Sequence, residues 1–168
     1  MKWTNHKMLT GAIVYAVTGN PLSAVVSAIG SVIPDAVEGF PDESNYNAWQ
    51  KSHRKGSHLA PVYLVTFLLC QAYIFIHPLP TTFYQVITMA KVSMLGNLPI
   101  VAWFIGMLSL GACFHIVEDA LCGKVPGLTL KQRVGVKLFY VGSAKEYLFV
   151  WPVSLALLFI RLKVENLI

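Results

Sequence analysis

Long apolar runs separated by short polar segments organise the whole chain. Aliphatic and aromatic side chains dominate residues 8–34, 59–76, 94–117 and 147–162. A helix needs about 20 apolar residues to cross the hydrocarbon core of a bilayer, so such runs predict helices that span or enter a membrane. The run at 59–76 is the clearest candidate for a spanning helix, and residues 81–90 are expected to begin a further helix or to lie at the membrane interface.

The first run is interrupted by Gly19-Asn20-Pro21, which is a turn signal. Each half then has only about a dozen residues, which is too short to span a bilayer comfortably as a helix. The pattern predicts a short N-terminal helical hairpin or a re-entrant pair, in which small residues let the two helices approach closely.

Composition agrees with a membrane protein. Of the 168 residues, 55% are hydrophobic and only 12% are charged, whereas about a quarter of the residues in a soluble domain are charged. We therefore expect an all-α, polytopic membrane helical bundle that forms a single domain over residues 1–168, with the lipid bilayer as its main partner. The basic residues form no stripe interleaved with aromatic residues, so nucleic acid is not an expected partner.

Basic residues are distributed unevenly between the two ends of the predicted helices. The opposite side has Lys91, with Arg161 and Lys163 added if the last run crosses the membrane. The positive-inside rule then places the side richer in basic residues in the cytoplasm. That side carries ten of them: Lys2, Lys7, Lys51, Arg54, Lys55, Lys124, Lys131, Arg133, Lys137 and Lys145.

Histidines and acids stand at the ends of the apolar runs. If each run crosses the membrane, or dips into it and returns, these groups arrive at one face of the bilayer. Imidazole and carboxylate groups at membrane depth are costly, so their convergence predicts a functional site. The groups are His6, Asp35, His58, His115, Glu118 and Asp119.

The spacing of these groups indicates a metal site. His115 and Asp119 are four residues apart, so on a helix both face the same way and can bind one ion. His53 and His58 are five apart, which suits a loop followed by the first residue of a helix. Mixed imidazole and carboxylate ligands favour zinc, with manganese or iron as alternatives, and the candidates suffice for one or two ions. The predicted ligands are His6, Asp35, His53, His58, His115 and Asp119.

Other polar residues are candidates for catalysis. Arg54 would meet an anionic substrate group, and Glu38 or Glu118 would act as the general base. Simpler interpretations stand beside these. Asp35 is also suited to capping a helix, Arg54 to anchoring the chain at the cytoplasmic surface, and Glu118 to facing solvent or orienting a ligating histidine.

The same residues resemble a known family. Ile33-Pro34-Asp35, His53-Arg54-x-x-Ser57-His58 and Gly111-x-x-x-His115-x-x-x-Asp119, followed by Gly123-x-Val125-Pro126, are similar in order to the motifs of the YdjM-like family. Its members are described as inner-membrane, metal-dependent hydrolases that LexA regulates in some bacteria. Two departures are visible: Val37 and Glu38 stand where the family often has Asp and His, and Lys55 and Gly56 alter the middle motif.

The resemblance implies a location and a chemistry. It implies a multi-pass protein of the bacterial inner membrane, with a fold distantly similar to that of zinc-dependent phospholipase C. A metal-activated water would then attack an anionic phosphoester or a lipid-linked ester at the cytoplasmic face. The alternative is a non-catalytic membrane protein, either a metal transporter or a small interaction protein with a structural metal site. A transporter would need polar groups along the whole depth of the bilayer.

Overall fold

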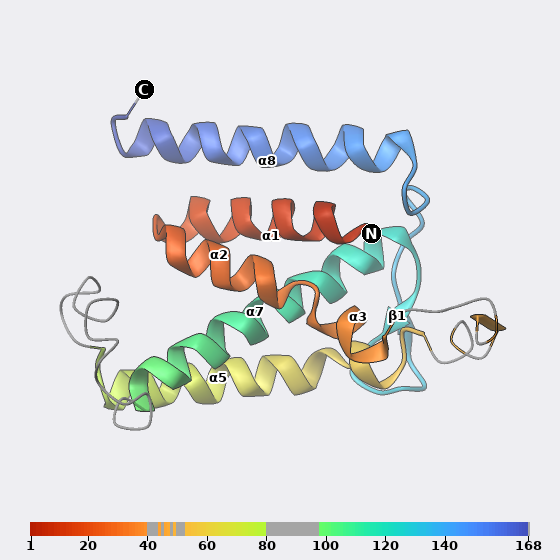
Figure 1. The fold of residues 1–168 in the computed structure, drawn as a ribbon, viewed down its shortest axis with the longest axis horizontal. Helices are drawn as coiled ribbons and strands as arrows, with labels where there is room; N and C mark the ends of the chain where they lie inside the picture. The colour runs from red at the N-terminus through yellow and green to blue at the C-terminus, as the bar shows by residue number, and fades with distance from the viewer. Residues whose placement is uncertain (40–43, 45, 48, 50–52, 80–97, 168) are drawn as a thin grey trace.

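The structure, a computed structural model, is mostly helical (Figure 1). It describes residues 1–39, 44, 46, 47, 49, 53–79 and 98–167. The helices are α1 (Trp3–Thr18), α2 (Pro21–Gly30), α3 (Ile33–Glu38), the 3-10 helix η1 (Gly56–His58), α5 (Ala60–Ile76), α7 (Leu98–Cys122) and α8 (Ala144–Val164). Two short strands, β1 (Val125–Pro126) and β2 (Arg133–Val134), pair antiparallel. The expected all-α fold is therefore confirmed in its helical part, whereas the strand pair was not predicted.

Three helical segments are long and apolar enough to cross a membrane: Pro21–Glu38, Leu98–Cys122 and Ala144–Val164. The first is longer than the sequence suggested, because α3 resumes after only two turn residues, Ser31 and Val32. The helix expected over 59–76 is present as α5, but with 17 residues and a length of about 25 Å it is shorter than the three candidate spans. The helix or interfacial segment expected at 81–90 lies outside the described residues.

The predicted N-terminal hairpin is present, and its turn follows from local chemistry. Gly19 ends α1 in the left-handed conformation, with φ of 64°. The Asn20 side chain then caps α2 by accepting hydrogen bonds from the backbone N–H groups of Leu22 and Ser23. Pro21 occupies the first helical turn, where its missing N–H costs nothing.

The close crossing of α2 and α7 depends on two glycines. A side-chain carbon at Gly30 would collide with the backbone of Leu108, and one at Gly111 would collide with the carbonyl oxygen of Ser27. With hydrogen in these positions the two helices approach backbone to backbone. This approach carries the end of α2, including the carbonyl of Ser31, against the middle of α7.

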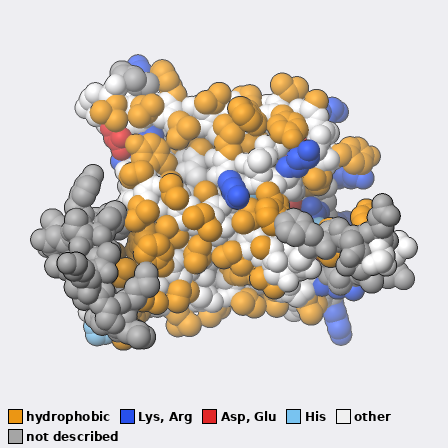
Figure 2. Space-filling model, viewed as in Figure 1, with side chains coloured by type: hydrophobic (Ala, Val, Ile, Leu, Met, Phe, Trp, Pro, Cys, Tyr) orange, Lys and Arg blue, Asp and Glu red, His pale blue; other side chains and the backbone are white. Residues whose placement is uncertain are grey.

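The long helices lie side by side, with α8 along α1, α5 along α7, and α2 between α1 and α7 (Figure 1). The starts of α1, α5 and α8 and the ends of α3 and α7 meet at one end of the bundle. Most of the Lys and Arg side chains visible in Figure 2 gather at this same end. The predicted histidines and acids lie here as well.

Candidate metal centre

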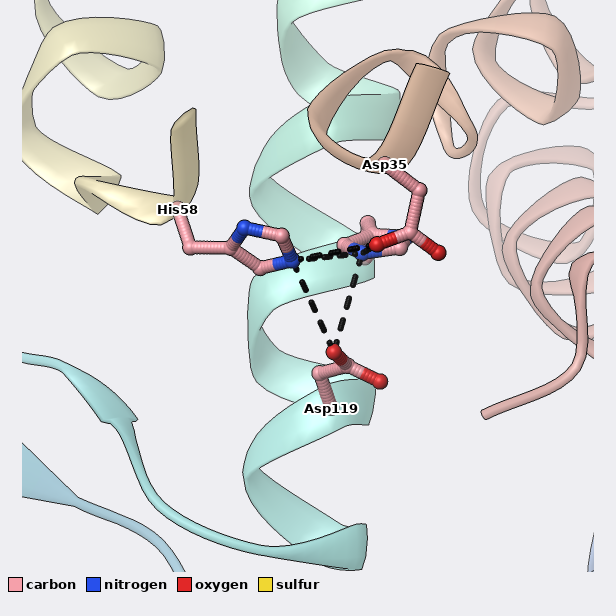
Figure 3. A group of neighbouring side chains, drawn as sticks. Asp35, His58 and Asp119 are labelled. Carbon is pink, nitrogen blue, oxygen red and sulfur yellow. Dashed lines mark hydrogen bonds and ion pairs between the residues drawn. The ribbon is translucent and has the colours of Figure 1, made fainter. Parts of the chain in front are cut away.

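Four side chains from three separate elements converge at this end of the bundle. Asp35 comes from α3, His58 from η1, and His115 and Asp119 from consecutive turns of α7 (Figure 3). Each contributes one ligand atom, and the four atoms all lie within 4.8 Å of one another. His58, His115 and Asp119 are buried, and Asp35 is partly exposed. These four residues form the four-donor group.

Five of the donor–donor distances are close to those between ligands of one small metal ion. The Nε2 atoms of His58 and His115 lie 3.2 Å apart, and Asp35 Oδ1 lies 3.3 and 3.4 Å from them. Asp119 Oδ2 lies 3.6 Å from His58 Nε2 and 3.8 Å from His115 Nε2. Ligand atoms bound at about 2.0–2.2 Å to a tetrahedral ion are separated by about 3.3–3.6 Å. The group therefore has the dimensions that a small divalent cation requires.

The two histidine rings are oriented by their other nitrogen. His115 Nδ1 lies 2.6 Å from the carbonyl oxygen of Ser31, which only accepts, so Nδ1 carries the hydrogen and Nε2 has the lone pair. His58 Nδ1 lies 3.1 Å from Glu38 Oε1 and 2.9 Å from Ser57 Oγ. Acceptors at Nδ1 of this kind fix the ring and make Nε2 a better metal ligand.

The electrostatic environment draws positive charge to the group. Burial lowers the pKa of His58, but the carboxylates of Asp119 and Asp35 act in the opposite direction and raise that pKa to about 9. Asp35 Oδ2 accepts a hydrogen bond from Trp3 Nε1 at 2.9 Å. Its other oxygen, Oδ1, has no hydrogen-bond donor among the described residues although it is buried. A buried carboxylate oxygen in this state is well suited to a cation.

Arg54 contacts the four-donor group through Asp119. Its Nε lies 2.7 Å from Asp119 Oδ2, the same oxygen that belongs to the four-donor group. The residue has a φ of 56°, a conformation that is uncommon outside glycine, and its carbonyl accepts a hydrogen bond from Arg133 Nη1 at 2.8 Å. Arg54 therefore helps to orient Asp119, in addition to any contact with a substrate.

His6 lies at the edge of the group, and like the other two rings it has an acceptor at Nδ1 and an aspartate near Nε2. Its Nδ1 lies 2.6 Å from Glu118 Oε2, and its Nε2 lies 3.4 Å from Asp119 Oδ1. The ring stacks on that of His115 with centroids 4.0 Å apart. Glu118 is buried and also accepts from Thr10 Oγ1 at 2.9 Å. Of the two interpretations of Glu118, the structure supports the orienting residue and not the solvated one.

His53 and His6 are the two predicted ligands that the structure leaves outside the four-donor group. His53 Nδ1 lies 2.5 Å from Glu38 Oε2, and the His53 ring stacks on Trp49 at 4.2 Å. Glu38 also accepts from the Ser57 hydroxyl and from the backbone N–H of Arg54. The side chains of His53 and Glu38 are 22% and 11% exposed, so this pair lies on the solvent side of the buried donors.

Glu146, in the first turn of α8, is a buried acid beside the centre that the sequence did not single out. Its carboxylate is buried and accepts from the backbone N–H groups of Lys2 and Gly142, at 2.8 and 2.6 Å, and from Asn5 Nδ2 at 2.6 Å. Glu146 thereby ties the start of α8 to the start of α1, next to His6. The one signal of this role in the sequence is an acidic residue directly before the last apolar run.

Comparisons with protein-family models, with curated proteins and with solved structures find no match to this chain. The arrangement of the side chains is therefore the basis on which a function is assigned. A buried Asp and His cluster that could hold a metal ion, at one end of candidate membrane helices, is the feature to be explained.

Proposed function

We propose that the protein is a membrane-bound, metal-dependent hydrolase. The observation that carries the proposal is the convergence of the four donor atoms within 4.8 Å of one another, with the Nδ1 atom of each histidine already held by an acceptor. Imidazole and carboxylate donors without a thiolate suit zinc first, with manganese or iron as alternatives. A metal ion held there would lower the pKa of a bound water, which supplies a nucleophile near neutral pH.

The residues around the donors support catalysis over mere metal storage. Glu38 and His53 form a hydrogen-bonded, partly exposed pair beside the group, and we assign to this pair the removal of a proton from an attacking water. Arg54 carries a fixed positive charge beside Asp119, and a guanidinium donates to anionic oxygens in a fork.

The proposed substrate is an anionic phosphoester or a lipid-linked ester that reaches the site from the cytoplasmic membrane face. Most visible basic side chains lie at the end of the bundle that holds the four-donor group, which supports a cytoplasmic location under the positive-inside rule (Figure 2). Membership of the YdjM-like family, with the bacterial inner membrane as location, is part of this proposal. It rests on the ordered motifs that contain Asp35, His58, His115 and Asp119.

A second candidate is a non-catalytic membrane protein with a structural metal ion. Structural zinc sites take four protein ligands, whereas catalytic sites usually take three and leave a position for water. The four-donor group supplies four. Under the hydrolase proposal three of these residues would suffice to hold the ion and the partly exposed Asp35 would be dispensable for that purpose, whereas a structural ion would need all four. A transporter fits less well, because the acids and histidines gather at one end.

The two candidates are separated by assaying the purified full chain in detergent. Metal content is measured first, and hydrolysis of phosphodiester, phosphomonoester, carboxylester and phospholipid substrates is then compared between the wild type and Asp119→Ala. We expect bound metal and turnover in the wild type, and loss of both in Asp119→Ala. Glu165→Ala, which removes an acid at the far end of α8, is the matched control. A metal-bound wild type that hydrolyses none of these substrates would favour the structural ion.

A further inference from the structure

The connection between α7 and α8 exposes cations and apolar side chains together. Between Asp119 and Glu146 the sequence contains no acidic residue. The exposed cations are Lys124, Lys131, Arg133, Lys137 and Lys145. The exposed apolar side chains include Leu128, Leu130, Val134, Val136, Leu138 and Tyr140, with Leu128 76% and Tyr140 68% exposed. We call residues 124–141 the basic hairpin.

The basic hairpin has a defined backbone, so this exposure is built into the fold. Its strands pair Val125 with Val134, and the chain beyond β2 pairs with the last turn of α7. There the N–H of Val136 donates to the carbonyl of Ala120 at 2.7 Å, and that of Leu138 donates to Leu121 at 3.0 Å. These bonds occupy carbonyls at the end of α7 and leave the leucines and lysines pointing outward.

The position of the basic hairpin between two candidate membrane spans indicates that it contacts the membrane surface. It joins the candidate spans Leu98–Cys122 and Ala144–Val164, so both of its ends are held at one membrane surface. Exposed leucines there enter the boundary between headgroups and acyl chains, and lysines contact anionic headgroups. An acidic protein or a nucleic acid would account for the cations but would leave the interleaved apolar side chains in water.

We propose that the basic hairpin binds anionic phospholipid headgroups of the membrane that holds the helices, with its leucines inserted at the interface. The hairpin also reaches the metal centre, since Arg133 donates to the carbonyl of Arg54, which pairs with Asp119. Lipid bound there lies near Arg54 and Asp119. The proposal concerns binding and stands whether or not the metal centre is catalytic.

Lipid selectivity of the full chain tests this proposal. The protein is reconstituted in phosphatidylcholine vesicles that contain a trace of spin-labelled phosphatidylglycerol or spin-labelled phosphatidylcholine, and the motionally restricted fraction of each probe is measured. We expect a clear preference for phosphatidylglycerol that falls at high ionic strength. The variant Lys131→Gln/Lys137→Gln should weaken the preference by up to about fivefold per lysine. The matched control Lys7→Gln/Lys163→Gln removes the same charge elsewhere and should retain the preference.

The apolar half of the surface is tested by Leu128→Gln/Leu130→Gln, which leaves the charge unchanged. We expect this variant to lose part of the preference, because the lysines are no longer held at headgroup depth. Near-ultraviolet circular dichroism checks that each variant keeps the wild-type fold. Equal restriction of the two probes by the wild type overturns the proposal. So does an equal loss in the lysine variant and its control, or an unchanged preference in the leucine variant.

Discussion

Three buried histidines, His6, His58 and His115, share one arrangement at the residue scale. In each ring Nδ1 faces an acceptor, two of them glutamates and one a backbone carbonyl, while Nε2 faces the aspartates. Rings fixed in this way lose little freedom when they bind a cation, and their basicity is raised by the partner. The partners of the rings are therefore as informative about the site as the ligands.

Replacing one such partner should weaken metal binding without removing a ligand. In Glu38→Gln the acceptor for His58 Nδ1 becomes neutral, and metal affinity should fall by about 10–100-fold with the site still filled at high metal concentration. Competition titration against a chelator measures the affinity. Glu165→Gln, a change of the same kind at the far end of α8, is the control. Equal affinity in Glu38→Gln and wild type would contradict the orienting role.

Replacing a ligand should have a larger and different effect. His115→Ala should lose metal, thermal stability and activity together, because metal-binding free energy adds to folding free energy. Arg54→Ala should retain bound metal and lose activity, since a charge-assisted contact is worth about 1.5–3 kcal/mol. Metal content, melting temperature and turnover of both variants check this pair. An Arg54→Ala enzyme as active as the wild type would reduce Arg54 to an anchor.

Metal binding should also depend on pH through His58. Its pKa is raised to about 9, so in the metal-free protein the imidazole holds a proton at neutral pH and the metal must displace it. Affinity should therefore rise with pH from near neutrality and level off above about 9. Calorimetry in buffers of different ionisation enthalpy should detect a released proton at pH 7.5. Affinity that stays constant between pH 7 and pH 9 would contradict this coupling.

At the scale of the elements, the short contact between α2 and α7 determines whether the donors meet. Gly30 and Gly111 let the helix backbones touch, and the resulting position of Ser31 orients His115. The small residues predicted a close approach within the N-terminal hairpin and not the crossing of α2 with α7, whereas the spacing of His115 and Asp119 predicted their common face. The place of His53 and the burial of Glu146 were not predictable in this way, because each depends on which distant segments fold against it.

The glycine contact can be tested with a matched pair of substitutions. Gly111→Ala should force α2 and α7 apart, cost about 1–3 kcal/mol of unfolding free energy and lower metal affinity. Gly11→Ala, where the added carbon would lie at an ordinary 3.5 Å from the Ala28 side chain, should be nearly neutral. Thermal unfolding and chelator competition measure both effects. Equal behaviour of the two variants would show that the crossing does not position His115.

At the scale of the whole molecule, the fold separates an apolar bundle from one polar end that holds the four-donor group, the Glu38–His53 pair and the basic hairpin. Much of this layout was predictable, because apolar runs and the placement of ionisable residues at their ends are properties of the sequence. The short strand pair was not predictable from the sequence, because its position depends on contacts with the end of α7.

The orientation of the polar end is open to direct measurement. The bias of basic residues places it in the cytoplasm. Cysteines introduced in place of Ser44 and Thr129 should react with a membrane-impermeant thiol reagent only after cells are opened. A third cysteine in place of Lys163, at the other end of α8, is the control and should be labelled from outside. Labelling of the Ser44 and Thr129 variants in intact cells would reverse the assignment.

The central claim is that Asp35, His58, His115 and Asp119 hold one divalent ion. X-ray absorption at the metal edge of the purified full chain tests it most directly, because the spectrum reports ligand type, number and distance. We predict a metal bound to two imidazole nitrogens and to oxygen ligands at about 2.0–2.2 Å, with no sulfur despite the nearby Cys122. A sulfur ligand, or a protein that purifies and refills without stoichiometric metal, would contradict it.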